Sequence, residues 1–123
     1  PWLTVRGRQL EARRRGGGMI WFDFATLCQG PTGLTDYIEI ARAFDTVFLS
    51  GIEIMAEEDS DAARRFVHLV DELYDRNVKL LATAAAPIDG LYTGRRLAFE
   101  FERTRSRLTE MQTHAYLAQA HLP

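Results

Sequence analysis

The strongest constraint on the fold of this chain is a strand–helix–strand pattern between residues 46 and 84. Residues 46–50 (TVFLS) are a mostly apolar run that ends just before Gly51, which predicts a buried β-strand. Residues 61–76 repeat apolar side chains every three or four positions, the spacing of one helix face. Residues 78–84 (VKLLATA) predict a second buried strand. Two strands joined by a helix form a βαβ unit with parallel strands and a right-handed crossover.

The residues before this unit predict a smaller β-rich part. Residues 2–6 (WLTVR) and 9–13 (QLEAR) alternate apolar and polar side chains, which predicts a β-hairpin around Gly7. Residues 13–18 (RRRGGG) predict a charged, flexible loop. A phosphate cradle is the alternative for these glycines, but a cradle requires a helix to follow it. The aromatic strand predicted at residues 19–24 (MIWFDF) follows instead.

Helices are predicted between and after the strands. A short helical turn is expected around residues 25–28, and Thr35 is expected to cap a second helix. Ser60 is the expected N-cap of the helix in the βαβ unit, and Asn77 its expected stop. A last helix is predicted from about residue 99 to residue 112, with a further turn near the end of the chain.

These elements predict an α/β fold, in which a small parallel sheet with flanking helices is built around the βαβ unit 46–84 and an N-terminal β-hairpin is added. The chain has 123 residues, enough for one domain with its own core. We expect residues 1–24 to be β-rich and residues 25–123 to be α/β within that single domain.

Charge is distributed unevenly along the chain. Five arginines against two acids give residues 1–35 a charge of +3, and eleven acids against three arginines give residues 36–75 a charge of −8. Seven basic residues against four acids return residues 76–123 to +3. This pattern favours contact with another domain or with a second copy of the chain. It does not favour nucleic acid, because a nucleic-acid-binding domain is usually basic overall.

Several kinds of site are absent from the sequence. The only lysine, Lys79, opens a predicted strand, so there is no P-loop. The three histidines are far apart and lack cysteine partners, so we expect no metal site. Cys28 is expected to be a buried, small apolar residue. No apolar run approaches the roughly 20 residues that a membrane-spanning helix needs.

The last predicted helix carries two arginines on one face. Arg103 and Arg107 are four residues apart, so their side chains are neighbours on the helix surface. Two such guanidinium groups can bind a phosphate or reach across an interface as an arginine finger. The alternative is simple ion pairing along the helix, of Glu100 with Arg103 and of Arg107 with Glu110.

Two small polar residues occur at the ends of the predicted parallel strands. Ser50 ends the first strand and Thr83 lies near the end of the second. Ligands of open α/β sheets bind beyond the carboxyl ends of the strands. Thr83 is therefore a candidate sensor of nucleotide phosphate, and Ser50 a weaker candidate, since no acidic pair accompanies it.

Five stretches of the sequence belong together as a pattern: FDFATLC (22–28), DYIEIARAFDTVFLSGI (36–52), ARRFVHLVDELYDRNVKLLATAAAP (63–87), LYTGRRLAFEFERTRSRLTEMQT (91–113) and AYLAQAH (115–121). They resemble the C-terminal part of ZapE-like ATPases, a bacterial cell-division family related to the mitochondrial "ATPase family gene one" proteins. The resemblance covers most of the chain in the family's order.

This resemblance implies that the chain, which begins at Pro1, is a C-terminal domain or fragment of an AAA+-type P-loop ATPase about three times as long. The Walker A, Walker B and first sensor motifs, with bound ATP and Mg²⁺, would belong to the upstream part, and the fragment alone would be inactive. The family's SRLxEMQ stretch places Arg107 as the preferred contact to nucleotide phosphate, in its own subunit or in a neighbour, with Arg103 second. The family often has aspartate where Gly51 stands and proline where Glu53 stands.

The resemblance also implies partners and a location. The partners would be the upstream ATPase core, a second copy of the protein, and the division ring or another protein that is remodelled. The location would be cytoplasmic, with peripheral membrane attachment at the division site as an option. The alternative function is a non-catalytic interaction module whose acidic face, residues 57–61, docks a basic partner.

Overall fold

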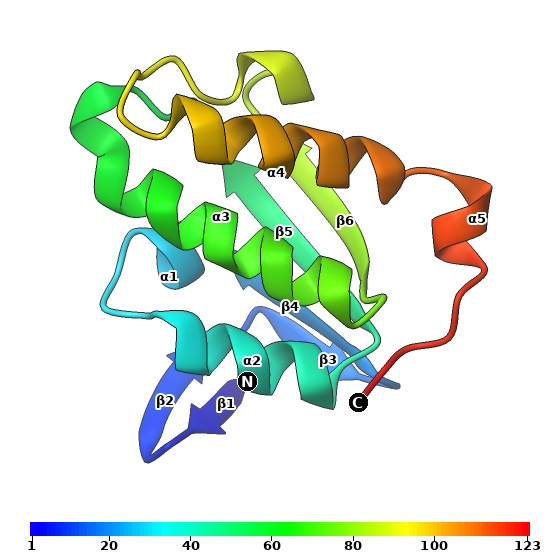
Figure 1. Cartoon of the computed structure of the whole chain (residues 1–123). Coiled ribbons are helices and arrows are strands. Elements are labelled where there is room, and N and C mark those ends of the chain that lie inside the picture. The colour runs from blue at the N-terminus through cyan, green and yellow to red at the C-terminus, as the bar shows by residue number, and fades with distance from the viewer.

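A computed structural model describes residues 1–123 and contains two sheets and a layer of helices (Figure 1). In chain order the elements are β1 (Trp2–Val5), β2 (Arg8–Glu11), β3 (Arg14–Gly16), β4 (Met19–Asp23), α1 (Phe24–Cys28), α2 (Leu34–Ala43), β5 (Thr46–Ile52), η1 (Glu57–Asp59), α3 (Ser60–Asp75), β6 (Lys79–Ala84), η2 (Ile88–Gly90), α4 (Ala98–Glu110) and α5 (His114–Leu117).

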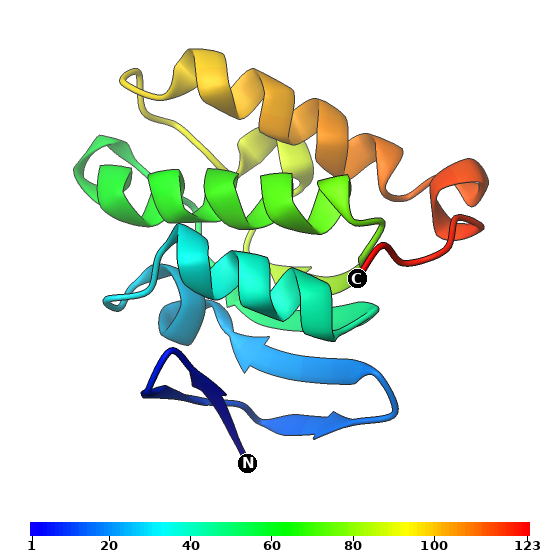
Figure 2. The same ribbon diagram turned by 60° about the horizontal axis from the view of Figure 1, so that its bottom comes forward.

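The larger sheet has the strand order β3-β4-β5-β6. Strands β4, β5 and β6 are parallel, and β3 pairs with β4 in the antiparallel sense. Strands β1 and β2 form a separate antiparallel pair, which lies on the β3 side of the molecule (Figure 2). The predicted α/β fold, its βαβ unit 46–84 and its N-terminal hairpin are therefore confirmed.

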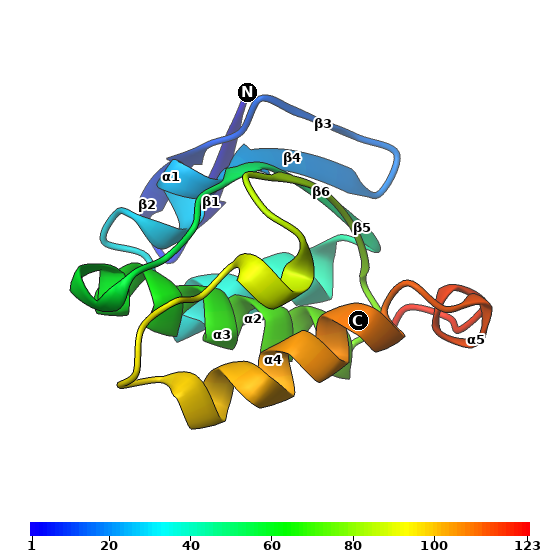
Figure 3. The ribbon, with the colours of Figure 1, turned by 90° about the horizontal axis from the view of Figure 1, so that it is seen from above.

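The helices α2, α3 and α4 all lie on one face of this sheet (Figure 3). The chain passes from β4 through α2 to β5 and then through α3 to β6, always moving in the same direction across the sheet. Because parallel crossovers are right-handed, two steps in one direction place both helices on the same face. The opposite face of β4, β5 and β6 is left without a covering layer.

The core lies between the sheet and the helices. Alternate strand residues, among them Phe22, Val47 and Leu49, are fully buried on the helix side, while their neighbours along each strand are only half-buried on the other face. Phe66 of α3 is buried at the centre, with its ring 6.0 Å from that of Phe101 and 6.1 Å from that of Phe24. Cys28 is fully buried, as predicted.

The prediction of a loop at residues 13–18 was wrong for half of this segment. Arg14–Gly16 forms the short edge strand β3, and Gly17 and Gly18, both with positive φ, make the turn into β4. The glycines allow a two-residue connection because left-handed conformations cost glycine little. All three residues of β3 are exposed, so the alternation of apolar and polar side chains that signals a half-buried strand is absent there.

The prediction that residues 78–84 form a buried strand was also wrong in part. The strand β6 exists and is parallel to β5, but it is the last strand of the sheet. Only Val78, just before it, is buried, and residues 81–84 are exposed. An apolar run indicates burial on both faces only if other elements cover it, and no element of this chain covers β6 on its outer side.

Helix boundaries follow the predictions closely, but both predicted N-caps were wrong. Helix α2 begins after Gly33, not Thr35, and the Asp36 carboxylate accepts the Gly33 N–H at 2.8 Å. The N-cap of α3 is Asp59, not Ser60, which is the first residue of the helix and whose hydroxyl donates to the Glu57 carbonyl. Asn77 ends α3 in the left-handed conformation (φ 56°), as expected of a helix stop.

Candidate functional site

The two arginines of α4 meet one carboxylate on the neighbouring helix α3. Arg107 Nη1 lies 2.5 Å from Asp71 Oδ1, and Arg103 Nη2 lies 3.0 Å from Asp71 Oδ2. The pair predicted from helical spacing is therefore present, and a single acid from α3 bridges it. The cluster of Arg103, Arg107 and Asp71 carries a net charge of +1.

The ring of Tyr74 packs against the guanidinium group of Arg107. The Arg107 guanidinium lies 4.7 Å from the centre of the Tyr74 ring, within cation–π range. The Tyr74 hydroxyl donates to Glu110 Oε1 at 2.9 Å, and this hydrogen bond raises the pKa of Tyr74. Glu110, one turn from Arg107, is thus engaged by Tyr74.

The alternative prediction, in which Arg103 and Arg107 form ion pairs along α4, named the wrong partners. Neither Glu100 with Arg103 nor Glu110 with Arg107 is among the ion pairs of the chain, and both arginines pair with α3 instead. A partner on a packed neighbouring helix is held in place by the core, whereas a partner on the same exposed helix face must be fixed at an entropic cost. Ion pairing itself is present, between helices.

The cluster has the chemistry of an anion site that is partly satisfied. Arg103 has 48% of its side chain exposed and Arg107 has 25%, so neither side chain is closed off from solvent. A guanidinium has five N–H donors, and Asp71 uses only some of them. A phosphate oxygen could bind the remaining donors, with the Asp71 carboxylate and the Tyr74 ring fixing the direction of Arg107.

Ser50 and Thr83 lie elsewhere, on the uncovered face of the sheet. Trp21 Nε1 donates to Ser50 Oγ at 2.9 Å, and Ser50 Oγ donates to Asp23 Oδ1 at 2.7 Å. Thr83 Oγ1 accepts the N–H of Gly51 at 2.9 Å. These side chains form a polar row at the carboxyl ends of β4, β5 and β6, where ligands of α/β sheets bind.

Asp23 is the acidic member of this row. Arg13 Nε donates to Asp23 Oδ1 at 2.7 Å, and this bond, followed by the bond from Ser50, lowers the pKa of Asp23. No group of at least three histidine, cysteine or acidic side chains that could hold a metal ion occurs in the chain, so Asp23 is not part of one. The row is a hydrogen-bonded network that holds its acid ionised.

The structure therefore brings the four predicted residues together in two pairs. Arg103 and Arg107 belong to the helix layer, and Ser50 and Thr83 point from the opposite face of the sheet. The sheet separates the pairs, so one bound phosphate cannot contact both pairs within a single chain.

Comparison with known proteins decides the family. Residues 1–120 match the model of the family described as AFG1-like ATPase. The chain belongs to the AFG1-like ATPase family. It is 41% identical over 122 residues to the cell division protein ZapE of Escherichia coli K12, an alignment that covers 99% of this chain and 32% of ZapE. It is 34% identical to lactation elevated protein 1 homolog B of Danio rerio, in an alignment that covers 93% of this chain and 29% of that protein.

The chain spans about a third of the length of these AFG1-like relatives. No solved structure matches the chain. None of its helices combines the length and the apolar character that crossing a membrane requires.

Two polar residues of this AFG1-like chain were missed by the sequence analysis. Asp71 was one of three acids near the end of the α3 pattern, and nothing in its spacing distinguished it from Glu72 or Asp75. Asp23 was hidden inside an aromatic strand, and its position beside Ser50 depends on the pairing of β4 with β5. The parallel order of those strands is the signal that could have found it.

Proposed function

We propose that this chain is the C-terminal portion of a ZapE-like ATPase that couples ATP hydrolysis to remodelling of a partner protein in cell division. The observation that carries the proposal is the 41% identity to ZapE over 99% of the chain, together with the AFG1-like ATPase match over residues 1–120. The whole protein would act in the cytoplasm, with peripheral attachment at the division site as an option.

In this proposal ATP and Mg²⁺ are bound by the part of the protein that lies outside this chain. The chain has no P-loop, since its one lysine, Lys79, contributes to β6 and its ammonium donates to the Gln119 carbonyl. Residues 1–123 alone are then inactive. They serve as a domain that senses the nucleotide state and contacts the ATPase core, a second copy of the protein, or the remodelled partner.

Arg107 is the residue we assign to the nucleotide, with Arg103 in support. An arginine finger must be extended and held before the phosphate arrives, because its value lies in stabilising charge in the transition state. The Asp71 carboxylate and the Tyr74 ring hold Arg107 in this way while leaving it partly exposed. Ser50 and Thr83 are assigned a lesser role, as polar contacts to a ligand at the uncovered face of the sheet.

The test is steady-state ATP hydrolysis by the full-length protein, comparing the wild type with Arg107→Ala and measuring nucleotide affinity beside it. The matched control is Arg64→Ala, which removes an exposed arginine from α3 that has no ion pair. We expect Arg107→Ala to lower kcat by about 100-fold or more at retained affinity, and Arg64→Ala to leave it unchanged. Unchanged turnover in a folded Arg107→Ala protein would remove Arg107 from the site.

The alternative function, a non-catalytic interaction module, depends on the acidic residues 57–61 being free to bind a partner. The Glu57 carboxylate accepts the backbone N–H groups of Arg95 and Arg96, which lowers the pKa of Glu57, and Asp59 accepts the N–H of Ala56. Two of the four acids therefore stabilise the local backbone. Partner binding that is salt-sensitive and survives Arg107→Ala would favour this alternative.

A further inference from the structure

The free edge of β6 is unlike the other edge of the same sheet. Natural edge strands are usually short or carry charges, prolines or bulges that prevent pairing. Strand β3 follows this rule, with three residues of which two are arginines. Strand β6 has six residues (KLLATA), and after its initial lysine it has no charge and no proline.

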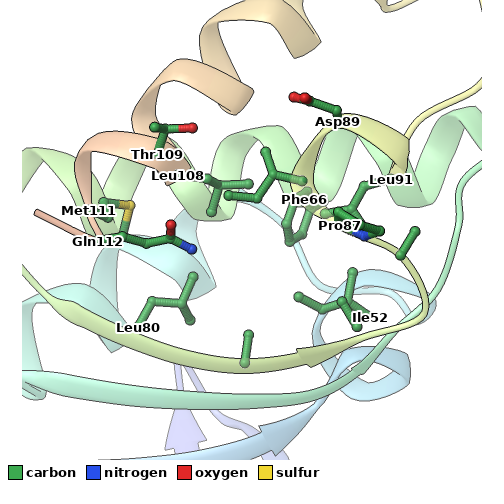
Figure 4. Close-up of a pocket in the computed structure, with 14 residues that line it drawn as sticks. Ile52, Phe66, Leu80, Pro87, Asp89, Leu91, Leu108, Thr109, Met111 and Gln112 are labelled. Atoms are coloured by element: carbon green, nitrogen blue, oxygen red, sulfur yellow. The ribbon is translucent and has the colours of Figure 1, made fainter.

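An apolar groove runs beside this edge on the helix side of the sheet (Figure 4). Its volume is about 560 Å³. Strand β6 contributes Leu80, Ala82 and Ala84, and α4 with the residue after it contributes Leu108 and Met111 from across the groove. The small alanines leave room that neither β6 nor α4 fills, so side chains from outside could be buried there.

Backbone hydrogen-bonding groups of β6 point outward along the same edge. The N–H groups of Lys79 and Ala85 donate to the β5 side, to Asp45 O and Ile52 O respectively, at 2.9 Å each. Successive N–H groups alternate in direction along a strand, so those of Leu80 and Ala82 face the free edge. The edge thus offers both donors for a backbone ladder and a groove for every second side chain of an added strand.

We propose that a strand from the part of the same polypeptide outside residues 1–123 pairs with β6 and places alternate apolar side chains in the groove. This is strand addition at an open sheet edge, in which the backbone supplies affinity and the groove supplies register. The inference rests on the proposed function, in that it takes the chain to be part of a longer AFG1-like ATPase.

The length of the relatives selects this occupant. The chain covers only 32% of ZapE, so about two-thirds of such a protein remains to supply the strand. A tethered strand has a high effective concentration at the edge, which a free partner must match by affinity. Parallel sheets are normally covered on both faces. The uncovered face of β4, β5 and β6 therefore also indicates that another part of the protein packs against this sheet.

The experiment is residue-resolved amide hydrogen exchange on the full-length protein, without nucleotide, at several protein concentrations. If β6 is paired, Leu80 and Ala82 exchange as slowly as the inward-facing amides of Leu81 and Thr83, within about tenfold. If the edge is free, Leu80 and Ala82 exchange at least about 100-fold faster than Leu81 and Thr83, and the proposal is overturned. Protection that appears only as the protein dimerises would assign the edge to a second copy and would also overturn it.

A proline substitution gives an independent test. Ala82→Pro removes an outward amide and is compatible with an unpaired edge strand. We expect it to release the added strand, so that Leu80 exchanges at least about tenfold faster than in the wild type. Arg15→Pro, at the outward-facing amide of the opposite edge strand β3, is the control and should leave Leu80 unchanged. Neither readout depends on ATP turnover, so this inference and the proposed ATPase role can fail separately.

Discussion

Asp71 is the residue that determines how the arginines of α4 are presented. Its carboxylate offsets one of the two positive charges. Because Asp71 lies on α3, both guanidinium groups of α4 contact the neighbouring helix. Helical spacing was sufficient to predict that Arg103 and Arg107 share a face. It could not predict their partner, because Asp71 lies 36 residues before Arg107 and is brought to it only by the packing of α3 on α4.

Asp23 is held by two hydrogen bonds that favour its ionised form. Hydrogen bonds from Arg13 and Ser50 hold its pKa below the ordinary value of 3.8, so the ionised form stabilises the folded state. That contribution is fully present above pH 3.8 and is lost as the pH falls through the lower folded-state pKa. We expect Asp23→Asn to lower the free energy of unfolding at neutral pH and to lose this effect in acid.

The measurement is the free energy of unfolding of wild type and Asp23→Asn as a function of pH, with an NMR titration of the Asp23 carboxyl as a direct check. Because the side chain is 37% exposed, solvent screens the pair and the difference should be small. A folded-state pKa at or above 3.8, or a difference that grows toward acid pH, would contradict the network described for β4 and β5.

At the scale of elements, one buried carboxylate joins the N-terminal hairpin to the helix layer. Asp36 of α2 is 1% exposed and accepts from Arg8 of β2, as well as from the Gly33 N–H. Removing Arg8 would leave a buried charge with a single donor. Breaking such pairs costs about 3–5 kcal/mol when both partners are buried, and less here because Arg8 is 43% exposed.

We therefore expect Arg8→Ala to lower the free energy of unfolding by about 2 kcal/mol, measured by denaturant titration. Arg14→Ala is the matched control, since Arg14 is an exposed arginine on the neighbouring strand β3 with no ion pair. Equal effects of the two substitutions would mean that the Arg8–Asp36 contact does not hold the hairpin against α2.

The elements also show where sequence periodicity is sufficient and where it is not. Helix α3 and the strands around it were predicted because burial of Phe66, Val70 and Leu73 imposes a 3.6-residue period. The burial of β6 was mispredicted because period and composition describe a strand's own residues, whereas burial depends on what lies beside it. The edge strand β3 was missed for the converse reason, since arginines and glycines need no burial to pair with β4.

At the scale of the whole molecule, the chain is a sheet covered by helices on one face and open on the other. Its two candidate site pairs lie on opposite sides of that sheet, and its longest unprotected edge belongs to β6. A unit of this kind, spanning about a third of its AFG1-like relatives, is suited to contact other parts of an ATPase on more than one side. The proposed division of labour follows, with hydrolysis upstream and an arginine supplied from α4.

The most direct test of this account is the kcat for ATP hydrolysis of full-length Asp71→Ala, with and without Arg107→Ala. If Arg107 acts on the nucleotide, removing it still lowers kcat by at least about tenfold after Asp71 is gone. If Arg107 serves only to pair with Asp71, the double variant should turn over ATP as fast as Asp71→Ala alone. That second result would contradict the assignment of Arg107 to the nucleotide and leave it as a contact between α3 and α4.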